Sequence, residues 1–278
     1  APTLSGVFGT MVIGPLSDTL GRKKVLIVIA FLYLLSALAS AFASSYMMLV
    51  TARAIGGLAF TSLMIAPMYI AEIAPARLRG KLVSINQLNI VIGLSAAYFA
   101  NYYILGASES DASWVTDWGV DANTWRWMLG VEIIPAVIFF LGLFLIPDSP
   151  RWLISKGREE EAREVMGKLL PSDAIDTEIQ LIRDGHDVES ESLWHRVKGI
   201  FGPRMRLALV VGIIVGIVQQ ITGINAIFFY APTIFEQSGI GTDAAYAQAA
   251  LIGLINVVFT LVAIALIDRW GRKPLLLV

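Results

Sequence analysis

The sequence lacks cysteine altogether and has only two histidines among its 278 residues. The missing cysteine excludes disulfides and thiolate metal sites but does not assign the protein to a cellular compartment. Charged residues are scarce as well, because Asp, Glu, Lys and Arg make up 15% of the chain, against roughly 25% in ordinary soluble domains. A formal net charge of −1 argues against a nucleic-acid partner, since such partners attract basic chains.

Apolar residues take the place of the charged ones. They make up 56% of the chain, and the mean hydropathy is +0.69. A helix needs about 20 apolar residues to cross the hydrocarbon core of a bilayer. Because buried strands are only about 4 to 8 residues long, such runs indicate an all-α membrane protein. Seven runs predict membrane-spanning helices, at residues 2–16, 25–43, 47–71, 82–105, 127–146, 207–230 and 244–267.

The first of these runs is short, and the chain opens and closes within apolar segments. We therefore expect the sequence to be a piece of a longer protein. The loops indicate an orientation, since cytoplasmic loops carry excess Lys and Arg. Alternation of the spans places every basic residue on the cytoplasmic side except Arg53 and Arg126. We expect a multi-pass protein of the cell (inner or plasma) membrane.

One long segment, Pro147 to Arg206, has the character of a soluble region. Ser149 before Pro150 is typical of a helix N-cap followed by proline at the first helical position. We expect short amphipathic helices here, on the cytoplasmic side. The predicted domains are an N-terminal transmembrane bundle at residues 1–146, cytoplasmic linker helices at 147–206 and the start of a C-terminal transmembrane bundle at 207–278.

A polar stretch interrupts the sixth apolar run. Gln219 and Asn225 are six residues apart, or about 240° on an ideal helix, so they face one cavity only if the helix unwinds. We expect unwinding at Gly223, because glycine tolerates unusual backbone conformations. Buried amides need hydrogen-bond partners, and on the residues alone two uses stay open: binding of a polar ligand, or hydrogen bonds between helices.

Amides suit the hydroxyls of a monosaccharide, because each amide carries both donors and an acceptor. Amides also bring no charge that must be desolvated. The candidate substrate-binding amides within the spans are Gln87, Gln219, Gln220, Asn225 and Asn256.

Two charged residues fall inside predicted spans. Arg53 and Glu132 each lie about six residues from the outer end of their span, hence at a matching depth of roughly 9 Å. A charge at that depth is costly unless paired and indicates function. We expect the two to pair and Glu132 to help couple proton movement to substrate movement; a purely structural ion pair is the alternative.

Two cytoplasmic turns repeat a pattern. Gly14–Lys24 and Asp268–Lys273 each place an Asp three residues before Gly-Arg-Lys, as parallel repeats in transporters do, although a pair of positive-inside anchors would look similar. With these turns, the chain resembles a sugar porter of the major facilitator superfamily. The other motifs that carry the resemblance are Arg53–Gly57, Pro67–Glu72 with Arg79-Gly80, Pro147–Arg151 and Gln219–Asn225.

The resemblance implies a partial major facilitator fold of about seven transmembrane helices out of twelve, namely the second to the eighth, so that the N-terminal bundle lacks its first span. The runs Lys81–Gln87 and Trp125–Glu132 look most similar to bacterial xylose/proton symporters. In such proteins the matching positions carry the same residue types and contact the sugar. The resemblance therefore favours sugar binding by the candidate amides over hydrogen bonds between helices. Leu94 and Phe229 depart from the xylose pattern, so a hexose such as glucose is at least as plausible as xylose.

The resemblance also bears on coupling and gating. Proton-coupled members carry an acid at the position of Glu132, and their main proton-accepting Asp lies in the first span. Charged residues at cytoplasmic helix ends match the gate that closes the inside of these carriers through ion pairs. These residues are Asp18, Arg22, Glu72, Arg79, Asp148, Arg151, Asp268 and Arg272.

We expect secondary active transport of a monosaccharide, hexose or xylose, by alternating access as sugar/proton symport. A facilitative uniporter and a non-transporting sugar sensor are the alternatives. An enzyme is not expected, because no span holds a cluster of nucleophile and base or of metal ligands; His186 and His195 both fall in the soluble segment. The expected partners are the monosaccharide, the proton as coupling ion and the lipid bilayer, with no other cofactor, no metal and a monomeric state.

Overall fold

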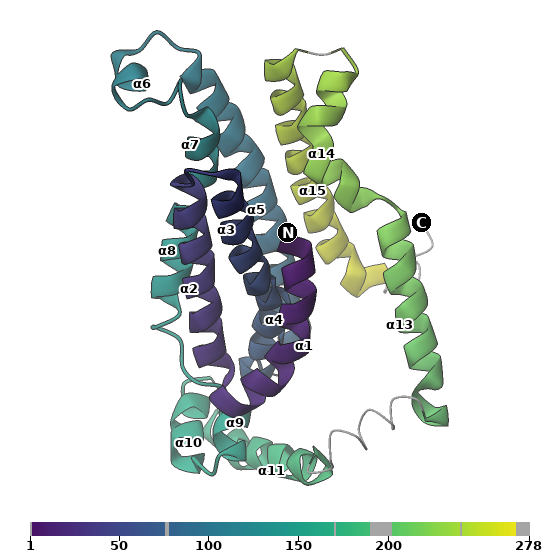
Figure 1. Ribbon diagram of the computed structural model, residues 1–278. Coiled ribbons are helices and arrows are strands. Elements are labelled where there is room, and N and C mark those ends of the chain that lie inside the picture. The colour runs from purple at the N-terminus through teal and green to yellow at the C-terminus, as the bar shows by residue number, and fades with distance from the viewer. Residues whose placement is uncertain (1, 76–77, 170, 190–201, 240, 271–278) are drawn as a thin grey trace. The chain divides into compact units, whose positions relative to one another are not determined.

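The computed structural model describes residues 2–75, 78–169, 171–189, 202–239 and 241–270. Those residues form helices and connecting turns, with no strand among them (Figure 1). The N-terminal helices are α1 (Pro2–Leu20), α2 (Arg22–Ala41), α3 (Tyr46–Leu58), α4 (Ser62–Ile73), α5 (Arg79–Ser108), α6 (Ser113–Asp117), α7 (Thr124–Gly130) and α8 (Ile133–Gly142). They are followed by α9 (Pro150–Ser155), α10 (Glu159–Gly167), α11 (Ser172–Glu189), α13 (Pro203–Ile221), α14 (Ile224–Gln237) and α15 (Thr242–Trp270).

Six helical segments of the described chain are long and apolar enough to cross a membrane. They are Arg22–Ala41, Tyr46–Ile73, Arg79–Ser108, Thr124–Gly142, Met205–Gln237 and Ala244–Leu266, so six of the seven predicted spans are confirmed. The remaining one is the helix α1, which has the length of a span at 19 residues. It is not among the six because Thr, Ser, Gly, Pro and Asp interrupt its apolar residues.

The chain divides into two compact units, the first made of Ala1–Ile175 with Ala250–Val278 and the second of Asp176–Ala249. In the first, α2 is the central helix and packs against α1, α3, α4, α7 and α8. The core around it includes Val25, Leu26 and Ile29 of α2 with Ile65 of α4. The predicted division at residues 146 and 206 concerns the bundles of the whole protein and stays a prediction.

Small residues let α2 and α3 approach closely. A Cβ placed on Gly56 of α3 would lie 2.4 Å from the Ser36 Oγ of α2, which no real side chain tolerates. Ser36 Oγ in turn donates a hydrogen bond to the Ala52 carbonyl at 2.8 Å. Such contacts between small residues are the usual way in which helices associate within a membrane.

The second unit contains α13, α14 and the first turns of α15. Ala231 of α14 is buried, as are Ala245 and Ala249 of α15. The predicted break in the sixth span is confirmed: α13 ends at Ile221 and α14 begins at Ile224. Gly223 between them is left-handed, with φ of 72°, a conformation that glycine adopts without steric cost.

Candidate functional site

The predicted ion pair within the membrane is present. Arg53 Nη1 lies 3.0 Å from Glu132 Oε2, and Arg53 Nη2 lies 3.3 Å from Glu132 Oε1. The two parallel bonds form the bidentate geometry that guanidinium and carboxylate groups favour. Although 79 residues separate the pair in sequence, their predicted depths match. The pairing is therefore confirmed, while its role in coupling stays a proposal.

Glu132 occupies a break in the helical path between α7 and α8. Pro135 has no backbone N–H, so the Val131 carbonyl has no donor four residues ahead. Ile134 N donates to Val131 O at 3.3 Å instead, and Glu132 N donates to Leu129 O at 3.4 Å. These hydrogen bonds span three residues instead of four and interrupt the regular helix at residues 131 and 132. Glu132 is therefore part of the interruption.

A second charged cluster lies at the basic turn between α1 and α2. Arg22 pairs with Asp18 at 2.9 Å and with Glu72 of α4 at 3.0 Å. It also donates to the Ser17 carbonyl at 2.9 Å. The other carboxylate oxygen of Glu72 accepts a hydrogen bond from Ser149 Oγ at 2.5 Å. Three of the predicted gate residues are thus connected to one another.

Ser149 links this cluster to the linker helices. Its hydroxyl also accepts from Trp152 N at 3.4 Å as the N-cap of α9, which confirms the predicted cap. Trp152 Nε1 donates to the Asp18 carbonyl at 3.2 Å. Its indole lies so close to Gly21 that an added Cβ would stand 3.0 Å from the ring. Helix α9 therefore holds the α1–α2 turn in place.

The other predicted gate residues are Arg79, Asp148, Arg151, Asp268 and Arg272. Arg79 is exposed at the start of α5, and Arg151 is exposed on α9. One carboxylate oxygen of Asp148 is buried without a hydrogen-bond partner among the described residues. Asp268 belongs to α15, but its side chain is outside the described set, and Arg272 lies outside the described residues.

The candidate amides separate into groups. Asn225 Nδ2 donates to Gln220 Oε1 at 3.1 Å across the break at Gly223. Gln219, one residue earlier on α13, contributes its carbonyl to the Thr222 hydroxyl at 2.6 Å. Gln87 is exposed on α5, and Asn256 is half-buried on α15. No hydrogen bond joins either of these two to another candidate amide within the described residues.

Comparison with known proteins decides the family. The family model described as "Sugar (and other) transporter" matches residues 1–278. The chain belongs to the sugar porter family. It is 37% identical to the arabinose-proton symporter of Bacillus subtilis over 276 residues, covering 98% of this chain and 57% of that protein. It is 40% identical to the D-xylose-proton symporter of Escherichia coli over 228 residues, covering 80% of this chain and 43% of that protein.

Solved structures agree with the sequence relatives. The partially occluded, inward-open xylose transporter XylE from E. coli superposes on this sugar porter with a TM-score of 0.81 and 33% identity, covering 99% of this chain and 62% of that one. The proton:xylose symporter bound to 6-bromo-6-deoxy-D-glucose gives a TM-score of 0.78 at 33% identity, with 99% and 59% covered. The predicted major facilitator fold and multi-pass membrane location are thereby confirmed for a chain that spans about half the length of its relatives, from 43% to 62% of those named here.

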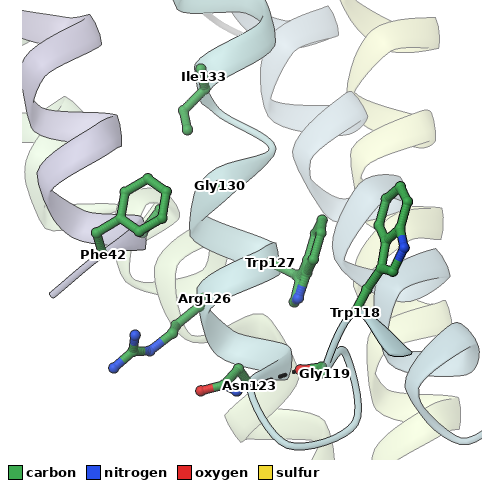
Figure 2. Close-up of a pocket in the computed structure, with 9 residues that line it drawn as sticks. Phe42, Trp118, Gly119, Asn123, Arg126, Trp127, Gly130 and Ile133 are labelled. Carbon is green, nitrogen blue, oxygen red and sulfur yellow. Dashed lines mark hydrogen bonds between the residues drawn. The ribbon is translucent and has the colours of Figure 1, made fainter. Parts of the chain in front are cut away.

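Two features of this sugar porter were not predicted. The first is the contact of Trp152 with the Gly21 turn, which joins residues more than a hundred positions apart. The second is a cavity of about 360 Å³ beside Arg126, lined by Phe42, Trp118 and Trp127 among others (Figure 2). A signal for the second was visible, because Arg126 is one of only two basic residues outside the predicted cytoplasmic segments and is flanked by tryptophans.

Proposed function

We infer that the whole protein moves a monosaccharide across the membrane by alternating access, in symport with protons. The bidentate ion pair of Arg53 with Glu132 carries the coupling part of this proposal. Relatives of this chain are named arabinose-proton and D-xylose-proton symporters. An intramembrane pair whose acid can take up a proton provides a physical link between protonation and conformation.

The link works through the charge on Glu132. When the carboxylate is ionised, it holds Arg53 in the geometry observed here. Protonation removes the negative charge and frees Arg53 from its partner. A change of that kind shifts a two-state carrier only if the pair differs between the two states. The break at residues 131 and 132 supplies a place where the helix path can change.

The sugar site is proposed to lie at the amides Gln87, Gln219, Gln220, Asn225 and Asn256. The break at Gly223 supports this assignment, because it exposes polar groups at membrane depth where backbone irregularity is otherwise avoided. A structural relative binds 6-bromo-6-deoxy-D-glucose, and another sequence relative is the glucose transporter GlcP of Staphylococcus epidermidis. A hexose is our proposed substrate, with xylose as the competitor to test.

The cytoplasmic charges are proposed to act as the gate. Arg22 and Glu72 already pair within one unit, whereas Arg79 projects from the first residue of α5 and is exposed. Ion pairs that exist in one state and break in the other bias the equilibrium between states. Individually exposed pairs are weak, so the gate depends on several acting together.

The test is uptake of labelled glucose and xylose by proteoliposomes that carry the full-length protein. We expect accumulation above equilibrium with an inward proton gradient, and a protonophore should abolish it. Glu132→Gln should still equilibrate sugar but should no longer accumulate it. Glu164→Gln, which removes an exposed acid of α10, is the matched control and should accumulate sugar normally.

Each contrary result leads to a specific alternative. Equilibration of sugar by the wild type without any dependence on the gradient would identify a uniporter. Binding of sugar without uptake would favour a sensor. Normal accumulation by Glu132→Gln would reduce the Arg53–Glu132 pair to a structural contact.

A further inference from the structure

A cavity at the outer end of the N-terminal helices has no part in the proposed transport cycle. It is formed by the end of α2, the turn after α6 and the helix α7, and its volume is about 360 Å³. Small-ligand pockets measure about 300 to 1,000 Å³, so the space suffices for a ligand group. Figure 2 shows Phe42, Arg126 and Trp127 around it. Helix α2 separates it by 20 residues, about 30 Å, from the basic cytoplasmic turn.

Arg126 is the charged residue of this cavity. Its Nη2 donates to the Ala43 carbonyl at 2.9 Å, and its guanidinium stacks 4.9 Å from the centre of the Trp125 ring. Its Nε is buried and has no hydrogen-bond partner in the described part of the chain. No carboxylate among the described residues pairs with it, whereas Arg53 and Arg22 both have acidic partners. A partly buried cation without a counter-charge favours an anionic ligand.

The surroundings are those of a membrane interface. Trp118, Trp125 and Trp127 are 67%, 44% and 37% exposed, and tryptophan gathers at the headgroup level of bilayers. An apolar surface continues from the cavity along α8, where Ile134 and Ile138 are exposed. A ligand seated here thus meets a cation at one end and hydrocarbon at the other, which is the polarity of a phospholipid.

We propose that this cavity binds an anionic glycerophospholipid of the outer leaflet, with its phosphate on Arg126 and its acyl chains along α8. Arginine matches phosphate oxygens through several N–H donors at once, and among the described residues the Arg126 guanidinium donates one hydrogen bond only, from Nη2 to the Ala43 carbonyl. The cavity lining contains no acidic side chain that would receive the ammonium group of a zwitterionic lipid. The site therefore prefers headgroups without a positive charge.

A sugar is a poorer occupant for this cavity. Sugars stack on open aromatic faces, but Trp118 and Trp127 stack on each other, with ring centres 6.0 Å apart and planes 20° apart. The cavity wall is mostly apolar, and Asn123 already donates to the Gly119 carbonyl at 3.5 Å. The guanidinium of Arg126 favours a negatively charged ligand, and a sugar is neutral.

The test is native mass spectrometry of the full-length protein in detergent, titrated with phosphatidylglycerol or with phosphatidylcholine of the same acyl chains. We expect one tightly held phosphatidylglycerol per protein and no equivalent phosphatidylcholine. Arg126→Gln should weaken that first site by roughly ten- to a hundredfold, the value of a hydrogen bond to a charged group. Arg163→Gln removes a cation from the exposed face of α10 and should leave the site unchanged.

Asn123→Asp is a second variant that does not depend on how well Arg126→Gln folds. The two side chains have nearly the same shape, and aspartate is well tolerated at the N-cap of α7. The new carboxylate next to Arg126 should supply the missing counter-charge and lower the affinity for phosphatidylglycerol several-fold. Phosphatidylcholine binding should stay as it was.

The proposal is overturned if folded Arg126→Gln and Asn123→Asp both keep the first phosphatidylglycerol at wild-type affinity. Equal affinity for the two lipids would also overturn it. If glycerol 3-phosphate, which has no acyl chains, binds Arg126 as tightly as the lipid does, the site serves a soluble anion instead. Retention of a monosaccharide in place of the lipid would contradict the charge argument.

Discussion

The two ion-paired sites of the N-terminal helices differ in how firmly they are embedded. At the end predicted to be cytoplasmic, the side chains of Arg22 and Glu72 are 12% and 8% exposed. At the outer site those of Arg53 and Glu132 are 29% and 47% exposed. The cytoplasmic pair also involves Asp18 and Ser149, whereas the outer pair has two members only among the residues that the structure describes.

The difference separates two uses of charge. A buried cluster with several partners is costly to break, because each lost partner leaves a desolvated charge. A pair that is more exposed and has fewer partners can open without breaking further bonds. We therefore expect the cytoplasmic cluster to contribute mainly to stability, and the outer pair to be the one that opens in the proposed coupling to protons.

The largest effect is expected at the buried cluster. Glu72→Gln should lower the free energy of unfolding by about 3 kcal/mol, the lower end for breaking a buried pair, because Asp18 still faces Arg22. Melting of the full-length protein in detergent measures the loss. Glu164→Gln, an exposed acid on α10, is the control. Equal melting temperatures for the two variants would show that the cytoplasmic cluster is no firmer than a surface pair.

A smaller effect should follow from the turn beside that cluster. Gly21 has φ of 91° and ψ of 151°, and its added Cβ would meet Trp152. Gly21→Ala should cost about 2 kcal/mol, from strained backbone and overpacking together. Gly157 also has positive φ, at 73°, but open space around it. Gly157→Ala should lower the free energy of unfolding by only about 1 kcal/mol. An equal loss for both variants would mean that Trp152 moves aside without cost when a Cβ is added at Gly21.

The outer pair should contribute less still to stability. Glu132→Gln is expected to lower the free energy of unfolding by less than Glu72→Gln does, because only one partner is lost and both side chains are more exposed, although it should abolish accumulation in the transport assay. Exchanging the charges, as Arg53→Glu with Glu132→Arg, should restore the melting temperature of the wild type without restoring coupling. If Glu132→Gln lowered the free energy of unfolding as much as Glu72→Gln does, the two ion-paired sites would not differ in stability.

The smallest effect concerns an exposed pair on α10. Two hydrogen bonds from Arg158, each of 2.6 Å, lower the pKa of Glu161 below its ordinary value. Folding thus favours the ionised carboxylate, so the stabilisation is complete above the unfolded pKa and is lost as the pH falls through the folded one. The difference in melting temperature between the wild type and Glu161→Gln should therefore disappear as the pH falls through the folded pKa of Glu161. A difference that is constant with pH would show that the pair has no electrostatic role.

The sequence predicted those features correctly that depend on one segment of the chain, or on the free-energy cost of one buried charge. Gly223 was predicted as a break because two amides six residues apart cannot share a face of a continuous helix. Arg53 and Glu132 were predicted to pair because each is too costly alone at its depth. In both cases local chemistry excluded the alternatives.

Long-range packing was beyond that reasoning. No pattern in the chain relates Trp152 to Gly21, or Ser149 to Glu72, because these contacts depend on where α9 docks after the helices have assembled. The interruption at residues 131 and 132 was readable from Pro135 but was hidden within one apolar run. The cavity at Arg126 needs the end of α2 and the α7 helix together, so neither segment reveals it alone.

The hydrogen bond between Asn225 and Gln220 has a consequence for affinity. This bond occupies one donor of Asn225 and the acceptor oxygen of Gln220. At the proposed sugar site, a hydroxyl that bonds to either atom would replace this hydrogen bond rather than add a new one, so the net binding free energy stays modest. In the proposed transport cycle, modest affinity would allow the sugar to dissociate on the other side of the membrane.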